Sequence, residues 1–296
     1  MTIVPRNIEN VPVRDTPVRR PVTGAQVVTV GDGVATTRRD QLATEEPMEI
    51  RVQGRGQEPV AFAVAMRTPG NDFELAAGLC KTEGIVDAPA DVETIAYCVA
   101  TDALERPEQQ YNIVTVRLRR PVSEDLRERR YLANSSCGIC GKAALDEVEV
   151  RCAPVGAGPR VAASTLRALP ERLAAHQSVF EQTGGLHAAA RFTAAGDLIA
   201  TREDVGRHNA LDKLIGHAFL AEELPLADQV LLVSGRLSFE LVQKAAIAGI
   251  PVLCAVSAPS SLAVAAAERF GQTVVGFLRG ARFNVYTRAD RLDLDA

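Results

Sequence analysis

The pattern of apolar and polar positions changes near the middle of the chain. In the first half, short apolar runs, some alternating with polar residues, predict strands at 27–30, 48–52, 60–66 and 111–118. Apolar residues at helical spacing predict one helix among these strands, at 72–81. The first half is therefore predicted to form a strand-rich unit.

In the second half, apolar strands alternate with amphipathic helices. The helices are predicted at 164–182, 204–221, 238–248 and 260–270. The strands are predicted at 188–192, 198–201, 229–234, 251–256, 273–278 and 283–286. Two of these strands are apolar throughout, which is typical of strands covered on both faces. We therefore expect an α/β fold (α+β overall), in which the second half is a three-layer domain with a parallel core to its sheet.

The chain divides into four predicted parts. Residues 1–24 carry four prolines among four arginines and are predicted to be a disordered tail. A strand-rich N-terminal domain follows at 25–134, and a cysteine loop and linker occupy 135–160. The C-terminal α/β domain, predicted to bind a cofactor, spans 161–290.

Composition agrees with two folded domains and narrows the class of protein. The 296 residues are 47% apolar, and one domain takes roughly 100–200 residues. The net charge of −4 argues against bulk nucleic-acid binding. Six cysteines are too few for a disulfide scaffold of this size, and the sequence has neither a membrane-spanning apolar run nor a signal peptide. We therefore expect a cytoplasmic protein with reduced thiols, bound to neither nucleic acid nor membrane.

The cysteine segment at 135–142 is the most reactive stretch of the sequence. Cys137 and Cys140 are flanked by glycines, preceded by two serines that could cap a helix, and followed by Lys142. A helix N-terminus and a nearby cation favour the thiolate, and they lower a cysteine pKa from about 8.5 toward roughly 3.5–7.5. The two cysteines are therefore candidate catalytic residues in sulfur, redox or metal chemistry.

A zinc site and a thioredoxin-like dithiol are weaker interpretations of this pair. Structural zinc usually needs a second pair of ligands at close spacing, and the sequence offers none. Zinc deaminases carry a His-x-Glu motif before Pro-Cys-x-x-Cys, whereas His187 follows the pair here. A thioredoxin-like pair follows an early strand of a βαβ unit, but this pair lies between two domains. We therefore predict no metal ligands.

Three segments that follow predicted strands suggest a ligand site. In open α/β sheets, ligands bind beyond the carboxyl ends of the strands, where helix N-termini attract anions. The candidate residues there are Ser234, Gly235, Arg236, Ser257, Phe277, Leu278, Arg279, Gly280, Ala281 and Arg282. Serines, glycines and arginines at these places favour a phosphorylated, nucleotide-bearing ligand.

Two further clusters add titratable groups. His187 follows two glycines at a strand start, although a lone histidine usually has a structural role. Asp204, Arg207 and His208 lie in a charged segment at a helix start, where Asp204 could cap the helix. We include all four among the candidate cofactor-binding residues.

Several motifs in one order resemble the FdhD (formate dehydrogenase accessory sulfurtransferase) family. They are CGICG at 137–141, GLHAAA at 185–190, EDVGRHNALDK at 203–213, SGR at 234–236, ELVQK at 240–244, AVSA at 255–258 and VYT at 285–287. The resemblance extends from about residue 45 to 287 and leaves the proline-arginine tail unexplained.

The resemblance implies a function and a set of partners. Members of this family take persulfide sulfur from a cysteine desulfurase and pass it to the bis(guanylyl) molybdenum cofactor, bis(molybdopterin guanine dinucleotide), before it enters formate dehydrogenase. Cys137 would be the persulfide carrier and Cys140 would assist it. The cofactor, or a GDP-like ligand, would bind the C-terminal domain through the segment 277–282.

The family also implies a homodimer, whose C-terminal domain resembles the cytidine-deaminase-like fold without its zinc. Two alternatives stay open, namely a cofactor chaperone that does not use the thiols, and a zinc or redox Cys-x-x-Cys protein.

Overall fold

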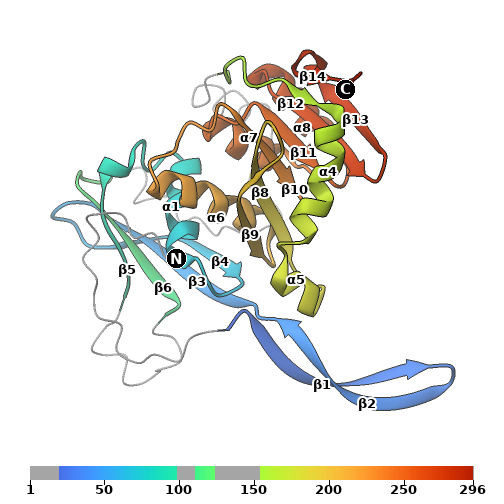
Figure 1. Ribbon diagram of the computed structural model, residues 1–296. Helices are drawn as coiled ribbons and strands as arrows, with labels where there is room; N and C mark the ends of the chain where they lie inside the picture. Colours follow the sequence, from blue (N-terminus) through green and yellow to red (C-terminus); the bar gives the residue numbers. More distant parts are fainter. Residues whose placement is uncertain (1–19, 99–110, 124–153, 296) are drawn as a thin grey trace.

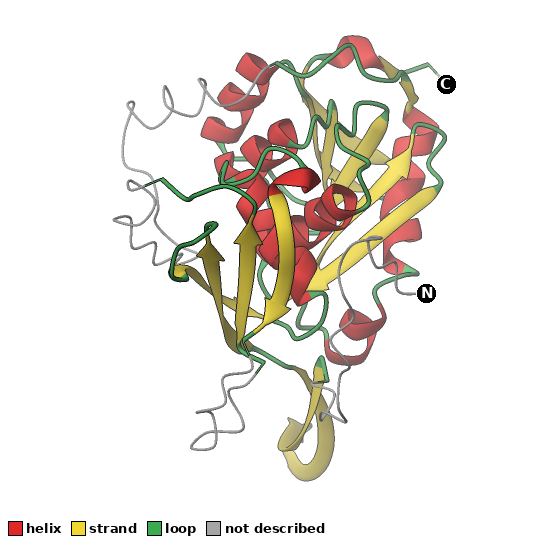
Figure 2. Ribbon diagram, turned by 90° about the vertical axis from the view of Figure 1, so that its left-hand side faces the viewer, coloured by secondary structure: helices red, strands yellow, loops and turns green. Residues whose placement is uncertain are grey.

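The computed structural model describes residues 20–98, 111–123 and 154–295. It contains a four-stranded sheet and a six-stranded sheet, with helices between them (Figures 1 and 2). Within these ranges no helix has the length and apolar character that a membrane span needs.

The four-stranded sheet belongs to the N-terminal half. Its strands are β3 (Glu46–Gln53), β4 (Val60–Arg67), β5 (Val92–Tyr97) and β6 (Ile113–Leu118), in the order β4-β3-β6-β5. Helix α1 (Asp72–Thr82) covers one face, where alternate residues such as Met48, Ile50 and Val52 form a core with Leu75 and Ala76. The strands predicted at 48–52, 60–66 and 111–118 correspond to β3, β4 and β6, whereas β5 was not predicted.

The six-stranded sheet belongs to the C-terminal half. Its strands are β8 (His187–Thr193), β9 (Leu198–Asp204), β10 (Gln229–Val233), β11 (Val252–Ala255), β12 (Thr273–Arg279) and β13 (Arg282–Thr287). The order is β13-β12-β11-β10-β8-β9, and β10, β11 and β12 are parallel to one another. The predicted parallel core is confirmed, and it is flanked by antiparallel strands on both sides.

Helices cover both faces of this sheet. Helices α6 (Arg207–Leu220), α7 (Phe239–Ile247) and α8 (Ser261–Phe270) share one core with Leu231 and Val233. Helix α4 (Ala163–Ala174) packs on the opposite face. The three predicted layers are therefore confirmed. The short strands β7 (Val161–Ala162) and β14 (Leu292–Asp293) pair with each other, and 3₁₀ turns lie at Pro89–Asp91 and Ala289–Arg291.

The single helix predicted at 164–182 is wrong. The structure has α4 and a separate short helix, α5 (Ser178–Thr183). The Glu203 carboxylate accepts the backbone N–H groups of Val179 and Phe180, which stabilises the start of α5.

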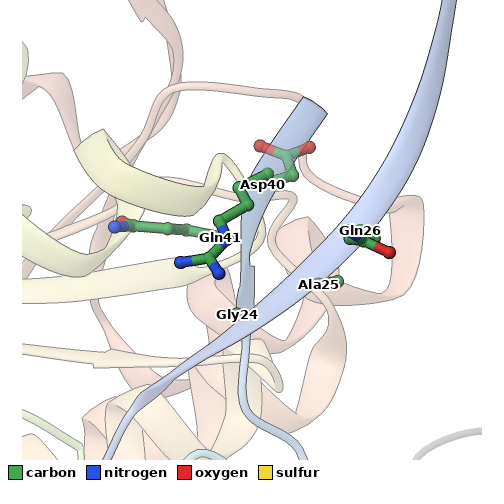
Figure 3. Close-up of a pocket in the computed structure, with 6 residues that line it drawn as sticks. Gly24, Ala25, Gln26, Asp40 and Gln41 are labelled. Carbon is green, nitrogen blue, oxygen red and sulfur yellow. The ribbon is translucent and has the colours of Figure 1, made fainter. Parts of the chain in front are cut away.

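A long hairpin projects from the body of the molecule (Figure 1). It consists of β1 (Val22–Gly31) and β2 (Val34–Ala43), paired in continuous antiparallel register. Strand β1 begins at Val22, inside the range predicted as a tail, and β2 was not predicted. A hollow at the twisted middle of the hairpin (Figure 3) is lined by hairpin residues alone and by none of the candidate site residues.

Helices α1 and α6 join the two halves at close range. A Cβ atom built on Gly78 would lie 1.8 Å from the Asp212 carbonyl oxygen, and one built on Gly216 would lie 1.8 Å from the Glu74 carbonyl oxygen. Only glycine at both places allows the two backbones to touch. The two halves are therefore closely interlocked.

Candidate functional site

The candidate site residues outside the cysteine segment gather along one edge of the six-stranded sheet. Ser234, Ser257 and Phe277 lie at or just beyond the carboxyl ends of the parallel strands β10, β11 and β12. Strand β8 is antiparallel to β10 and β9, so His187 at its start lies at the same edge, opposite Asp204. The sheet order places these segments in one row.

Four basic side chains form a cationic cluster at one part of this row, namely His187, Arg207, His208 and Arg236. A Cβ atom built on Gly235 would lie 3.3 Å from His187 Nδ1 and 3.8 Å from Arg207 Cδ, so Gly235 is packed between these two side chains. Burial lowers the pKa of His187, and the positive charges of Arg207, His208 and Arg236 lower it further. The imidazole therefore stays largely neutral at neutral pH while the arginines supply the charge.

We expect His187 to make the fold less stable in acid. Because its pKa is lower in the folded protein than in the unfolded chain, the unfolded chain binds more protons as pH falls below about 6.5, and the free energy of unfolding decreases. This loss should level off below the folded pKa. Urea denaturation between pH 5 and 7.5 measures the slope, which His187→Gln should reduce. His176→Gln replaces an exposed histidine and is the control. Equal slopes of the free energy of unfolding against pH in the two variants would contradict the prediction.

Arg207 supplies the clearest unsatisfied donor of the cluster. It is the first residue of α6, where the helix dipole favours negative charge. Its Nε atom is buried and has no hydrogen-bond partner among the described residues. A buried donor without a partner is costly, and an anionic ligand would satisfy it.

His208 contacts two residues that were not among the candidate site residues. Its Nε2 lies 3.1 Å from Ser238 Oγ and 2.9 Å from Glu240 Oε2. Hydrogen bonding with His208 lowers the pKa of Glu240, although partial burial opposes this effect. Glu240 therefore carries a negative charge beside His208. Glu240 lies in the first turn of α7, a helix that follows the end of β10. This position could have identified it as a candidate site residue from the sequence.

The segment 277–282 forms the end of β12, a tight turn and the start of β13. Phe277 has φ +53°, in the left-handed region that bulky residues rarely adopt, at a register shift between β12 and β13. Its N–H donates to the Ser257 carbonyl at 3.0 Å, which holds the distorted backbone to the segment that follows β11. Such strain is often found at ligand sites.

The side chains of this segment divide into two sets. Arg279 and Arg282 are exposed, and the Arg279 guanidinium lies 5.8 Å from the centre of the Phe277 ring. Gly280 makes the turn with φ +58°, followed by Ala281. Leu278, by contrast, is completely buried in the core beneath α4. The two arginines can therefore meet an anion, whereas Leu278 supports the segment from inside.

Asp204 is occupied by internal contacts. It is fully buried, and one carboxylate oxygen contacts Lys213 Nζ at 2.7 Å and accepts the Thr68 N–H at 3.1 Å. The other accepts the Gly206 N–H and the Asn209 amide, each at 2.9 Å. Both oxygens are used, so we assign Asp204 to joining the two halves of the chain and not to ligand contact.

Two details of the sequence interpretation change accordingly. Helix α6 begins at Arg207 with Gly206 as its N-cap, so the predicted start at Asp204 is wrong. Asp204 ends β9 instead. The Ser234 hydroxyl is also engaged, because it accepts the Ala188 N–H at 2.9 Å.

Cys137 and Cys140 lie outside the described residues, as does Cys152. Burial raises the pKa of Cys80 to about 12, with smaller contributions from Asp212 and Glu83, and burial also raises the pKa of Cys254. These two thiols stay protonated and are poor nucleophiles. Across 20–98, 111–123 and 154–295, no three or more His, Cys, Asp or Glu side chains are placed to hold a metal ion.

The sequence matches the FdhD/NarQ family over residues 43–293. The chain is 51% identical over 276 residues to the sulfur carrier protein FdhD of Streptomyces coelicolor, covering 92% of this chain and 95% of that protein. It is 53% identical over 262 residues to the sulfur carrier protein FdhD of Mycobacterium tuberculosis, covering 86% of this chain and 93% of that protein.

The fold is also similar to a crystal structure of a candidate formate dehydrogenase accessory protein from Desulfotalea psychrophila. The TM-score is 0.70, and the comparison covers 92% of this chain and 99% of that one. The sequence identity is 22%, so this likeness concerns the fold alone. It confirms the predicted α/β fold class.

Proposed function

The chain belongs to the FdhD/NarQ family, and from this premise we propose that it carries sulfur for the maturation of formate dehydrogenase. Cys137 would accept persulfide sulfur from a cysteine desulfurase and transfer it to the bis(guanylyl) molybdenum cofactor, which binds as a substrate along the sheet edge. The sulfur-carrier role is supported by relatives named sulfur carrier protein FdhD, whose sequences are 51% and 53% identical to this chain.

The chemistry of the first step suits a thiolate. The Cys137 thiolate attacks the outer sulfur of the desulfurase persulfide, a new S–S bond forms on Cys137, and the desulfurase cysteine leaves as a thiolate. Two of the three described cysteines support this assignment, because burial suppresses the thiolates of Cys80 and Cys254. Cys140 would assist, either by releasing the product or by protecting Cys137 as a disulfide.

The observation that carries the cofactor assignment is the row of cationic groups at one sheet edge. The cationic cluster lies beside the ends of β8, β9 and β10, and Arg279 and Arg282 lie at the end of β12 and the start of β13. The buried Nε of Arg207 needs an acceptor. A ligand with two guanine dinucleotide arms offers phosphates at separated places, which matches a row better than a single pocket.

Removal of an arginine from the segment 277–282 should weaken nucleotide binding. A hydrogen bond to a charged group contributes about 1.5–3 kcal/mol, so Arg279→Ala or Arg282→Ala should raise the Kd for GDP by roughly 10- to 100-fold. Isothermal titration calorimetry measures this change. Arg167→Ala, at an exposed position on α4 over the opposite face of the sheet, is the matched control and should keep its affinity. Unchanged affinity in both test variants would remove the segment from the ligand site.

Mass spectrometry tests the carrier role directly. The protein is incubated with a cysteine desulfurase and cysteine, digested, and searched for peptides heavier by one sulfur atom. We expect the added sulfur on Cys137. A protein that binds GDP but gains no sulfur would be a cofactor chaperone, and bound zinc in a metal analysis would favour the zinc protein.

A further inference from the structure

His187 occupies a place in the cationic cluster where both a proton and a ligand can reach it. Gly235 and Arg207 pack against its imidazole, with Gly235 buried and without a side chain that could cover the ring. The imidazole is only half-buried and forms no hydrogen bond with the described residues. A ring nitrogen is therefore available to accept a proton.

Positively charged groups face His187 from two further elements. Helix α6 contributes Arg207 and His208, which are its first two residues. The segment between β10 and α7 contributes Arg236, whose side chain is exposed. The dipole of α6 adds positive potential at the same end of the helix. A proton on His187 would therefore lie among like charges when the site is empty.

Two carboxylates near the cluster do not cancel these charges. Asp204 lies opposite His187 in the pairing of β8 with β9, but Lys213 Nζ compensates its charge at 2.7 Å. Glu240, on α7, is paired with His208 at 2.9 Å. Burial and the positive groups consequently lower the pKa of His187, and Asp204 opposes them by less.

An anionic ligand would reverse this balance. Phosphate oxygens close to Arg207 and Arg236 would place negative charge beside the imidazole and offset the charge of the two guanidinium groups. A nearby opposite charge favours the charged form of a titratable group. Occupation of the cluster should therefore favour imidazolium at His187, whereas the empty cluster favours the neutral ring.

We propose that His187 takes up one proton when the phosphorylated ligand binds, so that the cluster carries this charge only while it is occupied. The inference rests on the proposed function, because it takes the phosphates of the ligand to lie at the cluster. The proton comes from the solvent and adds to the unprotonated ring nitrogen, and no bond of the ligand is broken. In the empty protein the neutral ring avoids repulsion from Arg207 and Arg236.

The coupling between proton and ligand is reciprocal, so it makes the affinity depend on pH. Above the pKa of His187 in the complex, neither state is protonated and the coupling is absent. As pH falls below that value the complex gains the proton first, the affinity rises, and the rise ends below the pKa in the free protein. Between pH 8 and pH 6, the Kd for GDP should fall roughly three- to tenfold relative to that of His187→Gln.

Isothermal titration calorimetry counts the protons directly. In buffers of different ionisation enthalpy near pH 6.5, GDP should take up roughly half a proton more on binding the unmodified protein than on binding His187→Gln. The terminal phosphate of GDP itself titrates at about pH 6, but this contribution is common to both proteins and cancels in the difference. His176→Gln, at an exposed position away from the cluster, is the control and should match the unmodified protein.

The outcomes separate this inference from the proposed function. If GDP binds with the same proton uptake to the unmodified protein and to His187→Gln, the inference is overturned and the proposed function stands. If the uptake is lost in His208→Gln and kept in His187→Gln, the proton belongs to His208 and the inference is also overturned. If GDP does not bind the unmodified protein, both fail.

Nuclear magnetic resonance of the imidazole Cε1–H signals provides a test that does not depend on the folding of His187→Gln. The sequence has four histidines, so the signal of His187 can be assigned by elimination with His176→Gln, His208→Gln and His217→Gln. We expect it to titrate at a higher pH in the protein saturated with GDP than in the free protein. A signal that titrates at the same pH in both states overturns the inference.

Discussion

Replacement of Cys137 by alanine is expected to reduce activation of formate dehydrogenase to the level found without this protein. Alanine cannot form the persulfide, and burial leaves Cys80 and Cys254 as weak nucleophiles that cannot replace it. Because the sheet-edge site belongs to a separate part of the chain, GDP binding and the free energy of unfolding should stay unchanged. Formate oxidation by the client enzyme, matured with each variant, measures the effect.

Cys98→Ala is the matched control for this substitution. Cys98 is half-buried at the end of β5, and its loss should leave activation intact. Loss of activation in both variants would indicate a general sensitivity to cysteine replacement. Normal activation by Cys137→Ala would refute the carrier role, whatever the ligand binding shows.

Gly78→Ala is expected to lower the free energy of unfolding by about 3 kcal/mol or more. The added methyl group would lie 1.8 Å from the Asp212 carbonyl oxygen and 2.9 Å from the Gly216 backbone nitrogen. Neither contact can relax by rotation of a side chain, because both involve main-chain atoms. Helices α1 and α6 must therefore separate, which also disturbs the buried groups between them. Urea denaturation followed by circular dichroism measures the loss.

Gly156→Ala provides the comparison for this prediction. A Cβ atom at residue 156 meets nothing within 4 Å, so that variant should stay within about 1 kcal/mol of the unmodified protein. A similar change in both variants would show that the helix contact is looser than the structure indicates.

The elements of the C-terminal sheet were predictable because both of its faces are covered. Continuous apolar runs at 230–233 and 252–256 are typical of doubly covered strands, and both became central parallel strands. The chain order then placed their ends at one edge, where the site residues were expected. Strand β2 was not predicted because both of its faces are exposed and its apolar and polar residues do not alternate. The Asp32-Gly33 pair is nevertheless a strong signal for a hairpin turn.

The roles of individual charged residues could not be predicted from the sequence. Asp204 and Arg207 lie three positions apart in one charged segment. Asp204 forms a buried ion pair with Lys213, whereas Arg207 has a buried Nε donor without a partner among the described residues. The difference arises from Thr68, more than 130 positions away, which donates its N–H to Asp204. Contacts of such separation leave no local pattern. The role of Cys137 as the persulfide carrier stays a prediction.

The interlocked helices α1 and α6 have a consequence for the kinetics of the proposed sulfur transfer. Their crossing and the Asp204–Lys213 pair fix both halves of the chain to each other, and Cys137 lies in the sequence between Ser123 of one half and Pro154 of the other. If Cys137 carries the sulfur and the ligand binds the sheet edge of the same chain, the transfer between them is intramolecular. Once both are loaded, transfer should therefore be first order and independent of protein concentration.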